Sequence, residues 1–327
     1  MVVRVNHVED VADKLAQGAV AIGNFDGVHR GHQALLQKAR SWSDKRDRPC
    51  GVLTFSPHPA KVLAKGLAPQ SLFTDDEKVA HLGRFGADVV VLQPFSLDFA
   101  KLSPTEFVER VLQSALKVGA VVVGEDFSFG HKGSGNVSTL RQLLEPAGVA
   151  VIAVPAVREG NLVCSSTKVR EFVRTGNMPA AARILGRPYP LCGQVVQGDA
   201  RGRELGFPTA NVCTERELLP EVGVYATWAI LEDGRRLPSV TNIGLRPTFD
   251  GAGVRIEAHI LGDVDDDAVA FKEDLYGQDL TLDFVERIRP EVKFAGRDAL
   301  MAQIQTDITD ARRLLRQHAV SVDEESA

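Results

Sequence analysis

The residues best suited to chemistry lie in the stretch Ala19–Leu36. A short apolar run, Val20–Ile22, predicts a buried strand, and the next ten residues read GNFDGVHRGH. Two glycines allow a tight turn, and His29 and His32 follow where a helical pattern begins. Side chains three apart share one face of the first helical turn. A strand that leads through a glycine turn into a helix N-terminus presents backbone N–H groups to a phosphate. The stretch therefore predicts a phosphate-binding site.

The elements that must position these histidines follow from the apolar pattern of the first half. Continuous apolar runs, rather than alternating ones, predict strands buried on both faces of a parallel sheet at Val20–Ile22, Gly51–Phe55, Asp88–Leu92, Ala120–Val123 and Val149–Val154. Helical patterns lie between them at Gly31–Ser43, Asp75–Phe85, Pro104–Lys117 and Val137–Leu144. Such alternation predicts a doubly wound α/β domain.

The unusual polar residues follow the ends of these strands, where ligands bind on such sheets. Ser56-Pro57-His58-Pro59 follows the second strand, and Gly124–Gly130 follows the fourth. Beyond the fifth, Ser165–Arg170 predicts a helix start rich in hydroxyls with an arginine one turn later, which suits a polyphosphate. Plain N-capping by Ser166 or Thr167 is the alternative for the hydroxyls, and it leaves Arg170 unexplained.

Composition excludes several classes of protein. The chain has 327 residues, which predicts two domains, and a net charge of −5, which argues against a nucleic-acid partner. The first ten residues contain no apolar segment of signal-peptide length, and no apolar stretch is long enough to span a bilayer. The four cysteines are widely scattered, which predicts a reducing cytoplasm rather than a disulfide framework or a zinc site.

The pattern changes near Gly186, where two prolines follow, and we place the domain boundary between residues 1–186 and 187–327. Strand-like segments dominate beyond it: Gly193–Gln197, Val224–Leu231, Leu237–Ile243, Val254–Leu261 and Leu280–Ile288. A run of strands closed by one helix, about Arg297–Gln317, predicts a mainly antiparallel β-barrel with a C-terminal helix.

A glycine- and arginine-rich loop, GDARGRELGFPTAN at 198–211, precedes a strand of this second domain. Glycine amides can bind phosphate without a P-loop, and no G-K-[ST] triplet occurs in the chain, which excludes the Walker type. A surface loop with solvated arginines is the alternative interpretation.

Four motifs together resemble one family. The first half contains G-x-F-D-G-x-H-x-G-H, G-x-D-F-x-F-G and S-S-T-x-x-R, and the second contains G-R-x-L-G-F-P-T-A-N. These resemble the prokaryotic bifunctional riboflavin kinase/FAD synthetases, in which the first module is an FMN adenylyltransferase. The histidine motif alone would indicate only a nucleotidyltransferase of the H-x-G-H superfamily. The family often has an acid before Pro-His-Pro, whereas this chain has Ser56.

For the first module, the resemblance implies that the phosphate of FMN attacks the α-phosphorus of ATP, giving FAD and pyrophosphate. That nucleophile is already ionised, so the site needs positioning and charge stabilisation rather than a base. The implied catalytic residues are His29 and His32. The implied ATP-binding residues are Gly23, Phe25, Gly31, Ser166, Thr167 and Arg170, and the implied flavin-binding residues are Asp26, His58 and Asp126.

For the second module, the resemblance implies phosphorylation of riboflavin by ATP to FMN, with Glu257 as the base that takes the proton of the ribityl hydroxyl. From composition alone, Glu257 would be a surface carboxylate on a strand. Thr209 and Asn211 would hold Mg²⁺. The implied nucleotide or flavin contacts are Gly198, Gly202, Arg203, Gly206, Pro208, Asn211 and Arg246.

Three rivals to the bifunctional enzyme have less support, because the motifs of both modules are intact, the net charge is negative and the second half resembles a kinase. The chain could keep one activity and use its other module to bind flavin or to regulate. It could be a non-enzymatic flavin or RNA sensor, or an adenylyltransferase for another mononucleotide. The expected substrates and products are ATP, riboflavin, FMN and FAD, with no membrane partner, and nothing in the sequence requires an oligomer.

Overall fold

The computed structural model describes residues 2–64, 66, 68–198, 206–248, 251–263 and 271–326. Gly202 and Arg203, two of the expected kinase contacts, lie outside these residues, and Arg246 is placed only as a backbone position. The chain divides into two compact units, Met1–Ser166 and Thr167–Ala327. None of the helices in the described part of the chain is long and apolar enough to cross a membrane.

A six-stranded sheet forms the centre of the first unit, and all of its neighbouring strands pair in parallel. In spatial order the strands are β1 (Val3–Val5), β4 (Val89–Pro94), β3 (Cys50–Ser56), β2 (Ala19–Ile22), β5 (Ala120–Gly124) and β8 (Ala150–Val154). The predicted doubly wound α/β domain is therefore confirmed. The edge strand β1 was not predicted, because three residues are too few for a periodic signal.

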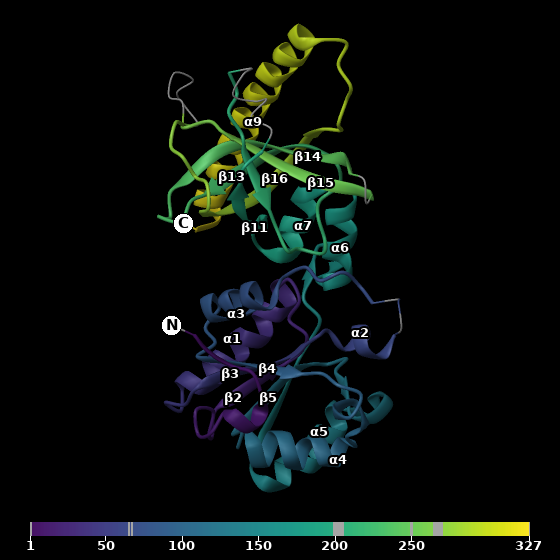
Figure 1. Ribbon diagram of the computed structural model, residues 1–327. Helices are drawn as coiled ribbons and strands as arrows, with labels where there is room; N and C mark the ends of the chain where they lie inside the picture. The colour runs from purple at the N-terminus through teal and green to yellow at the C-terminus, as the bar shows by residue number, and fades with distance from the viewer. Residues whose placement is uncertain are drawn as a thin grey trace. The chain divides into compact units, whose positions relative to one another are not determined.

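Helices cover both faces of this sheet, as Figure 1 shows. On one face, α1 (Arg30–Asp44) and α3 (Asp75–Arg84) bury Leu36 and Val79 against the strands. On the other face, α4 (Pro104–Glu106) continues as a π-helix over Phe107–Ala115 and packs with α5 (Val137–Leu144), burying Leu112 and Leu140.

Short elements fill the connections of the first unit. They are α2 (Pro59–Leu63), the paired strands β6 (Ser128–Phe129) and β7 (Gly135–Asn136), the paired strands β9 (Arg158–Glu159) and β10 (Leu162–Val163), and 3₁₀ turns at Val8–Asp10, Phe99–Lys101, His131–Gly133 and Glu145–Ala147.

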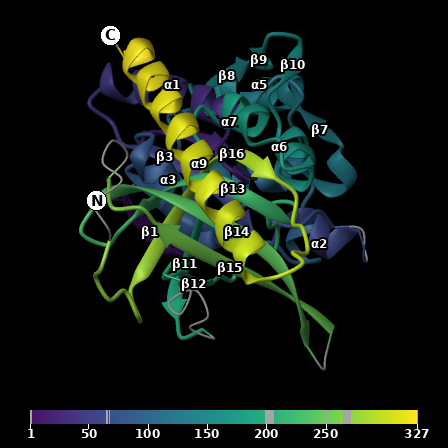
Figure 2. The same cartoon turned by 90° about the horizontal axis from the view of Figure 1, so that it is seen from above.

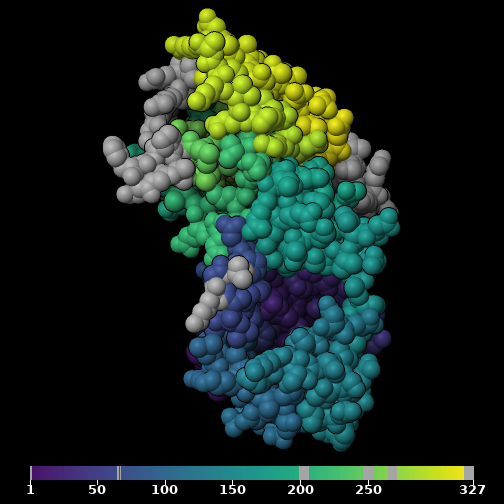
Figure 3. Space-filling model, turned by 90° about the vertical axis from the view of Figure 1, so that its right-hand side faces the viewer, coloured from purple at the N-terminus to yellow at the C-terminus, as the bar shows by residue number. Residues whose placement is uncertain are grey.

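A closed antiparallel barrel forms the second unit, which confirms the predicted architecture. Around the barrel the strands are β11 (Tyr189–Val196), β12 (Ala210–Cys213), β15 (Gly251–Ile260), β14 (Arg236–Thr248), β13 (Gly223–Ile230) and β16 (Asp279–Arg289). The last helix, α9 (Arg297–Ser326), lies across β13 and β16 and buries Ala311 and Leu315 against Trp228 and Val285 (Figure 2). In the space-filling view this C-terminal segment, in yellow, covers part of the green barrel (Figure 3).

Two details of the second unit differ from the sequence pattern. Pro190 does not interrupt regular structure but lies within β11, where it pairs with Asp283 of β16. At this point β11 has only one neighbour, because its pairing with β12 begins at Gln194, and a proline is tolerated on such an unpaired edge.

The compact second unit also begins before the expected domain boundary at Gly186. It includes most of α6 (Ser166–Arg174) and all of α7 (Met178–Leu185). The N–H of Glu221 donates to the carbonyl of Val173 at 3.2 Å, and a Cβ at Gly176 would lie 3.1 Å from the Tyr225 hydroxyl, so these helices pack closely on the barrel. The boundary between the functional domains stays a prediction.

Candidate functional site

The two motif histidines stack on each other at the start of α1. His29 is the N-cap residue, and its Nδ1 accepts a hydrogen bond from the backbone N–H of His32 at 3.4 Å. The two ring centroids lie 3.7 Å apart with an angle of 22° between the planes. A nitrogen that accepts a hydrogen bond carries no proton, so neutral His29 has its proton on Nε2. Because the loop after β2 leads directly into α1, the two histidines lie at the carboxyl edge of the sheet.

His32 is held in its neutral form. Burial, followed by the neighbouring His29 ring and the Lys78 ammonium group, holds the pKa of His32 well below its usual range. Its Nδ1 is buried and has no hydrogen-bond partner among the described residues. A neutral imidazole has one N–H group, which can donate one hydrogen bond to an anion.

The loop before the histidines is fixed by burial. Phe25 and Val28 have positive φ angles of 49° and 42°, yet both side chains are fully buried, so packing holds this otherwise unfavourable backbone. The buried Asp26 carboxylate accepts hydrogen bonds from the N–H groups of Leu72 and Phe73 at 3.0–3.2 Å. Asp26 thus fixes the segment that leads into α3, and its expected flavin contact stays a prediction.

Gly31 and Gly23 of the histidine motif allow neighbouring groups to pack closely. A Cβ at Gly31 would lie 3.0 Å from Cε1 of His29 and 3.3 Å from the carbonyl oxygen of Cys164. A Cβ at Gly23 would lie 3.3 Å from the Phe25 ring. The ring of His29 therefore depends on the missing side chain at Gly31.

The strands next to β2 bring further predicted residues to the same edge of the sheet. His58, after β3, caps α2, and its Nδ1 accepts the N–H of Ala60 at 3.1 Å. Asp126, after β5, is exposed. Ser56, at the position where the family often has an acid, donates a hydrogen bond from its hydroxyl to the carboxylate of Asp75, so an acid from α3 lies beside this position.

The S-S-T-x-x-R motif spans the division between the two units. The hydroxyl of Ser166 donates to the backbone carbonyl of Asp26 at 2.8 Å, which ties the end of the first unit to the histidine loop. Thr167 and Arg170 belong to the second unit, where Arg170 is buried. Their expected role in ATP binding stays a prediction.

The barrel carries a row of three polar side chains across neighbouring strands. Glu257 on β15 pairs with Asn211 on β12 and with Asn242 on β14. Residues paired directly across a ladder point to the same face of the sheet. Glu257 is half-buried, and its Oε1 contacts Nη1 of Arg255 at 3.4 Å. The predicted base and the predicted metal ligand Asn211 therefore lie side by side.

A cavity of about 310 Å³ lies between this face of the barrel and α9. Thr209 and Glu257 line it on the polar side, and apolar side chains such as Val240 and Ile304 line the rest. Arg289 also borders the cavity and makes a bidentate ion pair with Asp307 of α9, with distances of 2.8–3.1 Å. Because Asp307 is only 2% exposed, this pair is held rigidly.

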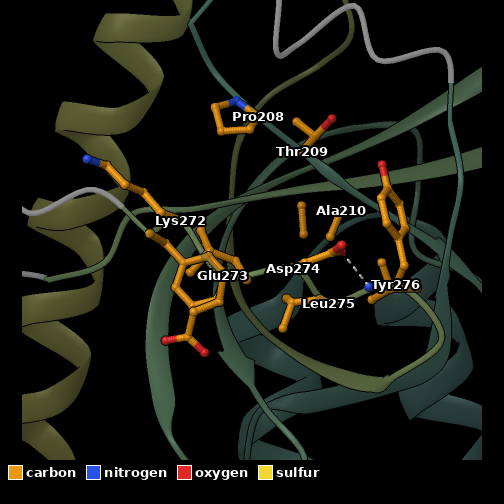
Figure 4. A pocket seen from close by; sticks show the side chains of 12 residues that line it. Pro208, Thr209, Ala210, Lys272, Glu273, Asp274, Leu275 and Tyr276 are labelled. Carbon is orange, nitrogen blue, oxygen red and sulfur yellow. Dashed lines mark hydrogen bonds between the residues drawn. The ribbon is translucent and has the colours of Figure 1, made fainter.

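A second cavity, of about 320 Å³, lies on the other side of Thr209. Figure 4 shows Pro208, Thr209 and Ala210 on one wall and the segment from Lys272 to Tyr276 on the other. Within that segment, Oδ1 of Asp274 accepts the N–H of Tyr276 at 3.1 Å. Thr209 contributes to the lining of both cavities.

Close contacts fix the start of β12. A Cβ at Gly198 would lie 2.1 Å from Nδ2 of Asn211, so only glycine leaves room for this amide. The carbonyl of Pro208 accepts a hydrogen bond from Nδ1 of His259 at 2.7 Å, which sets the proton of that imidazole on Nδ1. Burial lowers the pKa of His259. Gly206 has a φ of +87° two residues earlier.

Oxygen donors suited to a hard divalent cation come from Thr209 and Asn211, a hydroxyl and an amide. The tight packing of Gly198 on the Asn211 amide indicates a fixed side chain rather than a free surface one, and the role of Asn211 as a metal ligand stays a prediction. In the part of the chain that the structure describes, no group of three His, Cys, Asp or Glu side chains could hold a metal by itself. The nucleotide phosphates would have to complete the coordination.

Four residues near the two sites were not singled out from the sequence: Lys78, Asn242, Arg289 and Asp307. Asn242 falls within the strand-like segment Leu237–Ile243, but only its register opposite Glu257 shows its relevance. No individual role for Arg289 or Asp307 follows from the sequence, and the packing of α9 against β16 brings them together. Only the tertiary fold could have shown these contacts.

The fold and the two sites define a class of protein. An α/β sheet with stacked histidines at its carboxyl edge suits nucleotidyl transfer, and a barrel with a carboxylate beside two adjoining cavities suits phosphoryl transfer. The FAD synthetase family model matches residues 12–168, and the riboflavin kinase family model matches residues 185–315.

Curated relatives combine both modules in one chain. The bifunctional riboflavin kinase/FMN adenylyltransferase of Escherichia coli K12 is 38% identical over 306 residues, which cover 93% of this chain and 95% of the relative. The enzyme of the same name from Bacillus subtilis 168 is 33% identical over 309 residues, covering 93% and 94%. The chain belongs to this family of bifunctional enzymes. It phosphorylates riboflavin with ATP to FMN and transfers AMP from ATP to FMN to form FAD.

A solved structure shares the whole architecture. A crystal structure described as a macrolide-efflux protein from Streptococcus pneumoniae is 30% identical, has a TM-score of 0.84, and covers 95% of this chain and 98% of its own. The likeness extends over both units. The activities assigned here rest on the two family models and on the curated relatives.

Proposed function

We propose that His29 and His32 stabilise the phosphates of ATP during adenylyl transfer. Their rings are stacked, His32 is neutral, and its Nδ1 has no hydrogen-bond partner among the described residues, which suits an imidazole that donates one hydrogen bond to a phosphate oxygen. Gly23, Phe25 and Gly31 belong to the loop that contacts ATP, in which Gly23 packs against the Phe25 ring and Gly31 against the His29 ring. Ser166, Thr167 and Arg170 bind the part of ATP that leaves as pyrophosphate.

The flavin substrate of this step binds beside the same edge of the sheet, near Asp26, His58 and Asp126. One oxygen of the FMN phosphate attacks the α-phosphorus of ATP, and the bond to the β-phosphate oxygen breaks. The attacking oxygen is already ionised near pH 7, so no residue has to remove a proton. Stabilisation of charge on the phosphoryl oxygens is therefore the main task of the two histidines.

In the barrel, the hydroxyl substrate and the nucleotide bind in adjoining cavities. The cavity under α9 has apolar walls suited to the flavin ring and contains Glu257. The cavity lined by Lys272 and Tyr276 suits the nucleotide, and Thr209 borders both. Glu257 accepts the proton of the ribityl 5′-hydroxyl as its oxygen attacks the γ-phosphorus, and ADP leaves. Gly198, Gly202, Arg203, Gly206, Pro208 and Arg246 contribute further contacts to the nucleotide or flavin.

Mg²⁺ fits the kinase site best among divalent cations. Thr209 and Asn211 offer neutral oxygen ligands, and Mg²⁺ commonly completes its octahedral shell with substrate phosphates and water. The bound ion would share the negative charge of the phosphates. The four free cysteines, two of them buried, agree with an enzyme that acts in the cytoplasm. The adenylyltransferase domain would end near Gly186.

One observation carries the kinase assignment: the base Glu257 and the ligand Asn211 are cross-strand neighbours beside the wall that two cavities share. The direct test incubates the purified protein with riboflavin, ATP and Mg²⁺ and separates the flavins over time. We expect FMN to form first and FAD to follow. FMN alone would contradict the adenylyltransferase roles, and no product would contradict both sets of residues.

A variant test addresses the histidines separately. His32→Ala should lower adenylyl transfer about 100-fold or more, the loss expected for one oxyanion donor. Riboflavin phosphorylation by the same protein should persist and shows that the chain is folded. Wild-type FAD formation by His32→Ala would disprove the role given to His32.

A further inference from the structure

Lys78 is a buried cation that no motif singled out. It lies in α3, and its side chain is only 8% exposed. Removing an ammonium group from water is costly unless an anion or several acceptors compensate. A lysine in this position therefore needs an explanation beyond helix propensity.

The protein itself compensates this charge only weakly. Nζ of Lys78 lies 3.4 Å from Oδ1 of Asp75 and 3.5 Å from the carbonyl oxygen of Phe55. Both distances exceed those of strong charge-assisted hydrogen bonds. The other carboxylate oxygen of Asp75 accepts a hydrogen bond from the Ser56 hydroxyl. Among the residues that the structure describes, these are the hydrogen-bond partners of the ammonium group, which can donate three bonds.

The position of Lys78 is tied to the histidine motif. Asp26, within that motif, binds the N–H groups of Leu72 and Phe73, and Thr74 then caps α3 with a capping box to Glu77. The helix therefore begins at a point fixed by the motif itself. Phe55 lies near the carboxyl end of β3, directly beside β2, so the acceptor of Lys78 is on the edge of the sheet that carries the histidines.

His32, in the histidine motif, has a ring nitrogen without a hydrogen-bond partner in the part of the chain that the structure describes. Nδ1 of His32 is buried without a hydrogen bond among the described residues, and the charge of Lys78 contributes to the low pKa of His32. The lysine and the histidine are thus electrostatic neighbours. A neutral donor and a weakly compensated cation, close enough for the charge of Lys78 to lower the pKa of His32, favour an anionic ligand.

We propose that Lys78 is a phosphate-binding residue of the adenylyltransferase site, where its ammonium group faces the triphosphate of ATP beside His32. The proposal rests on the role given above to the two histidines. Adenylyl transfer brings the anionic phosphate of FMN against the anionic triphosphate, so a buried cation at this point reduces their repulsion. The bound phosphate in turn supplies the compensation that Asp75 and Phe55 give only weakly.

Two substitutions separate charge from packing. Lys78→Met keeps most of the length and the apolar stem but removes the charge, whereas Lys78→Arg keeps the charge in a bulkier group. The assay is FAD formation from supplied FMN, with riboflavin phosphorylation by the same chain as the internal control. Lys38→Met, an exposed lysine on α1, is the matched control.

We expect Lys78→Met to lower kcat/KM for ATP in FAD formation at least tenfold and to leave riboflavin phosphorylation within twofold of the wild type. Lys78→Arg should retain more FAD formation than Lys78→Met, and Lys38→Met should match the wild type. A residue needed only for packing would give the opposite order, because a buried methionine is tolerated better than a larger arginine.

The proposal is overturned if Lys78→Met forms FAD at the wild-type rate, or if Lys78→Arg is the more damaging variant. Should Lys78→Met lower the melting temperature, Asp75→Asn decides: it removes the anionic partner but keeps the cation. Retained FAD formation by Asp75→Asn supports the proposal, and a loss equal to that of Lys78→Met contradicts it. A wild-type protein that forms no FAD from FMN would refute the adenylyltransferase site itself, which is a different outcome.

Discussion

Replacing Gly31 by alanine tests whether the position of the His29 ring matters for adenylyl transfer. The new Cβ would lie 3.0 Å from Cε1 and 3.1 Å from Nδ1 of His29, and 3.3 Å from the carbonyl oxygen of Cys164. Favourable carbon–carbon contacts are about 3.5–4.0 Å, so the ring must recede by about 0.5 Å. It cannot do so freely, because His32 stacks against it at 3.7 Å.

The expected effect on catalysis is larger than the expected effect on stability. A misplacement of 1 Å can cost about 100-fold in rate, so a shift of half that size should cost about tenfold, or roughly 1.4 kcal/mol. Alanine is a better helix former than glycine by up to about 1 kcal/mol, which offsets part of the strain of the close contacts, so the melting temperature should fall by only a few degrees. FAD formation from FMN should therefore fall while the protein remains folded.

Two controls make this test of Gly31 decisive. Riboflavin phosphorylation uses the other unit and should be unchanged in Gly31→Ala. Gly296→Ala places its Cβ in open space before α9 and should leave both activities unchanged. FAD formation within twofold of the wild type would refute the reasoning about His29. Equal loss of both activities would show general damage rather than a displaced ring.

Three further predictions concern the barrel and pH. Gly198→Ala should lower riboflavin phosphorylation more than tenfold while FAD formation persists, because its Cβ would collide with the Asn211 amide. Riboflavin phosphorylation by Gly198→Ala at the wild-type rate would refute the need for a fixed Asn211. Asp307→Leu should lower the free energy of unfolding by about 3 kcal/mol in urea titrations, since it leaves Arg289 uncompensated. The double variant Arg289→Met/Asp307→Leu should recover most of the lost free energy of unfolding but little kinase activity. Recovery of both the stability and the kinase activity would show that Arg289 serves only the fold. The pKa of His32 is lower in the folded state, so acidification below about pH 6.5 protonates the unfolded chain first and destabilises the fold by up to about 1.4 kcal/mol per pH unit. His32→Gln should reduce this slope, and an unchanged slope would contradict the low pKa.

Local patterns were sufficient to predict the architecture. Apolar runs predicted β2, β3 and β5, and the barrel followed from strands with little helix between them. The same local pattern predicted the turn that carries His29 and His32, because a glycine turn between a strand and a helix is read within ten residues. These features depend on neighbours in the chain.

Contacts between distant segments could not be predicted in this way. Lys78 reads as one polar residue of an amphipathic helix, and only the fold shows that it is buried. Asn242 and Arg289 acquire meaning from strand register and from the helix that closes the barrel. Asp26 shows the same limit: its flavin contact, implied by the resemblance, stays a prediction, and only the fold shows that its carboxylate accepts hydrogen bonds from backbone N–H groups of a segment far along the chain.

The central claim is that one chain carries two separate sites, with Glu257 serving only the kinase reaction. Glu257→Gln keeps the shape of the side chain but cannot accept a proton, so it isolates this role. The measurement supplies the purified variant with ATP and Mg²⁺ and with either riboflavin or FMN, and separates the flavins by chromatography. We predict no FMN from riboflavin and FAD from FMN at the wild-type rate. FMN formation by this variant, or loss of both reactions, would contradict the account.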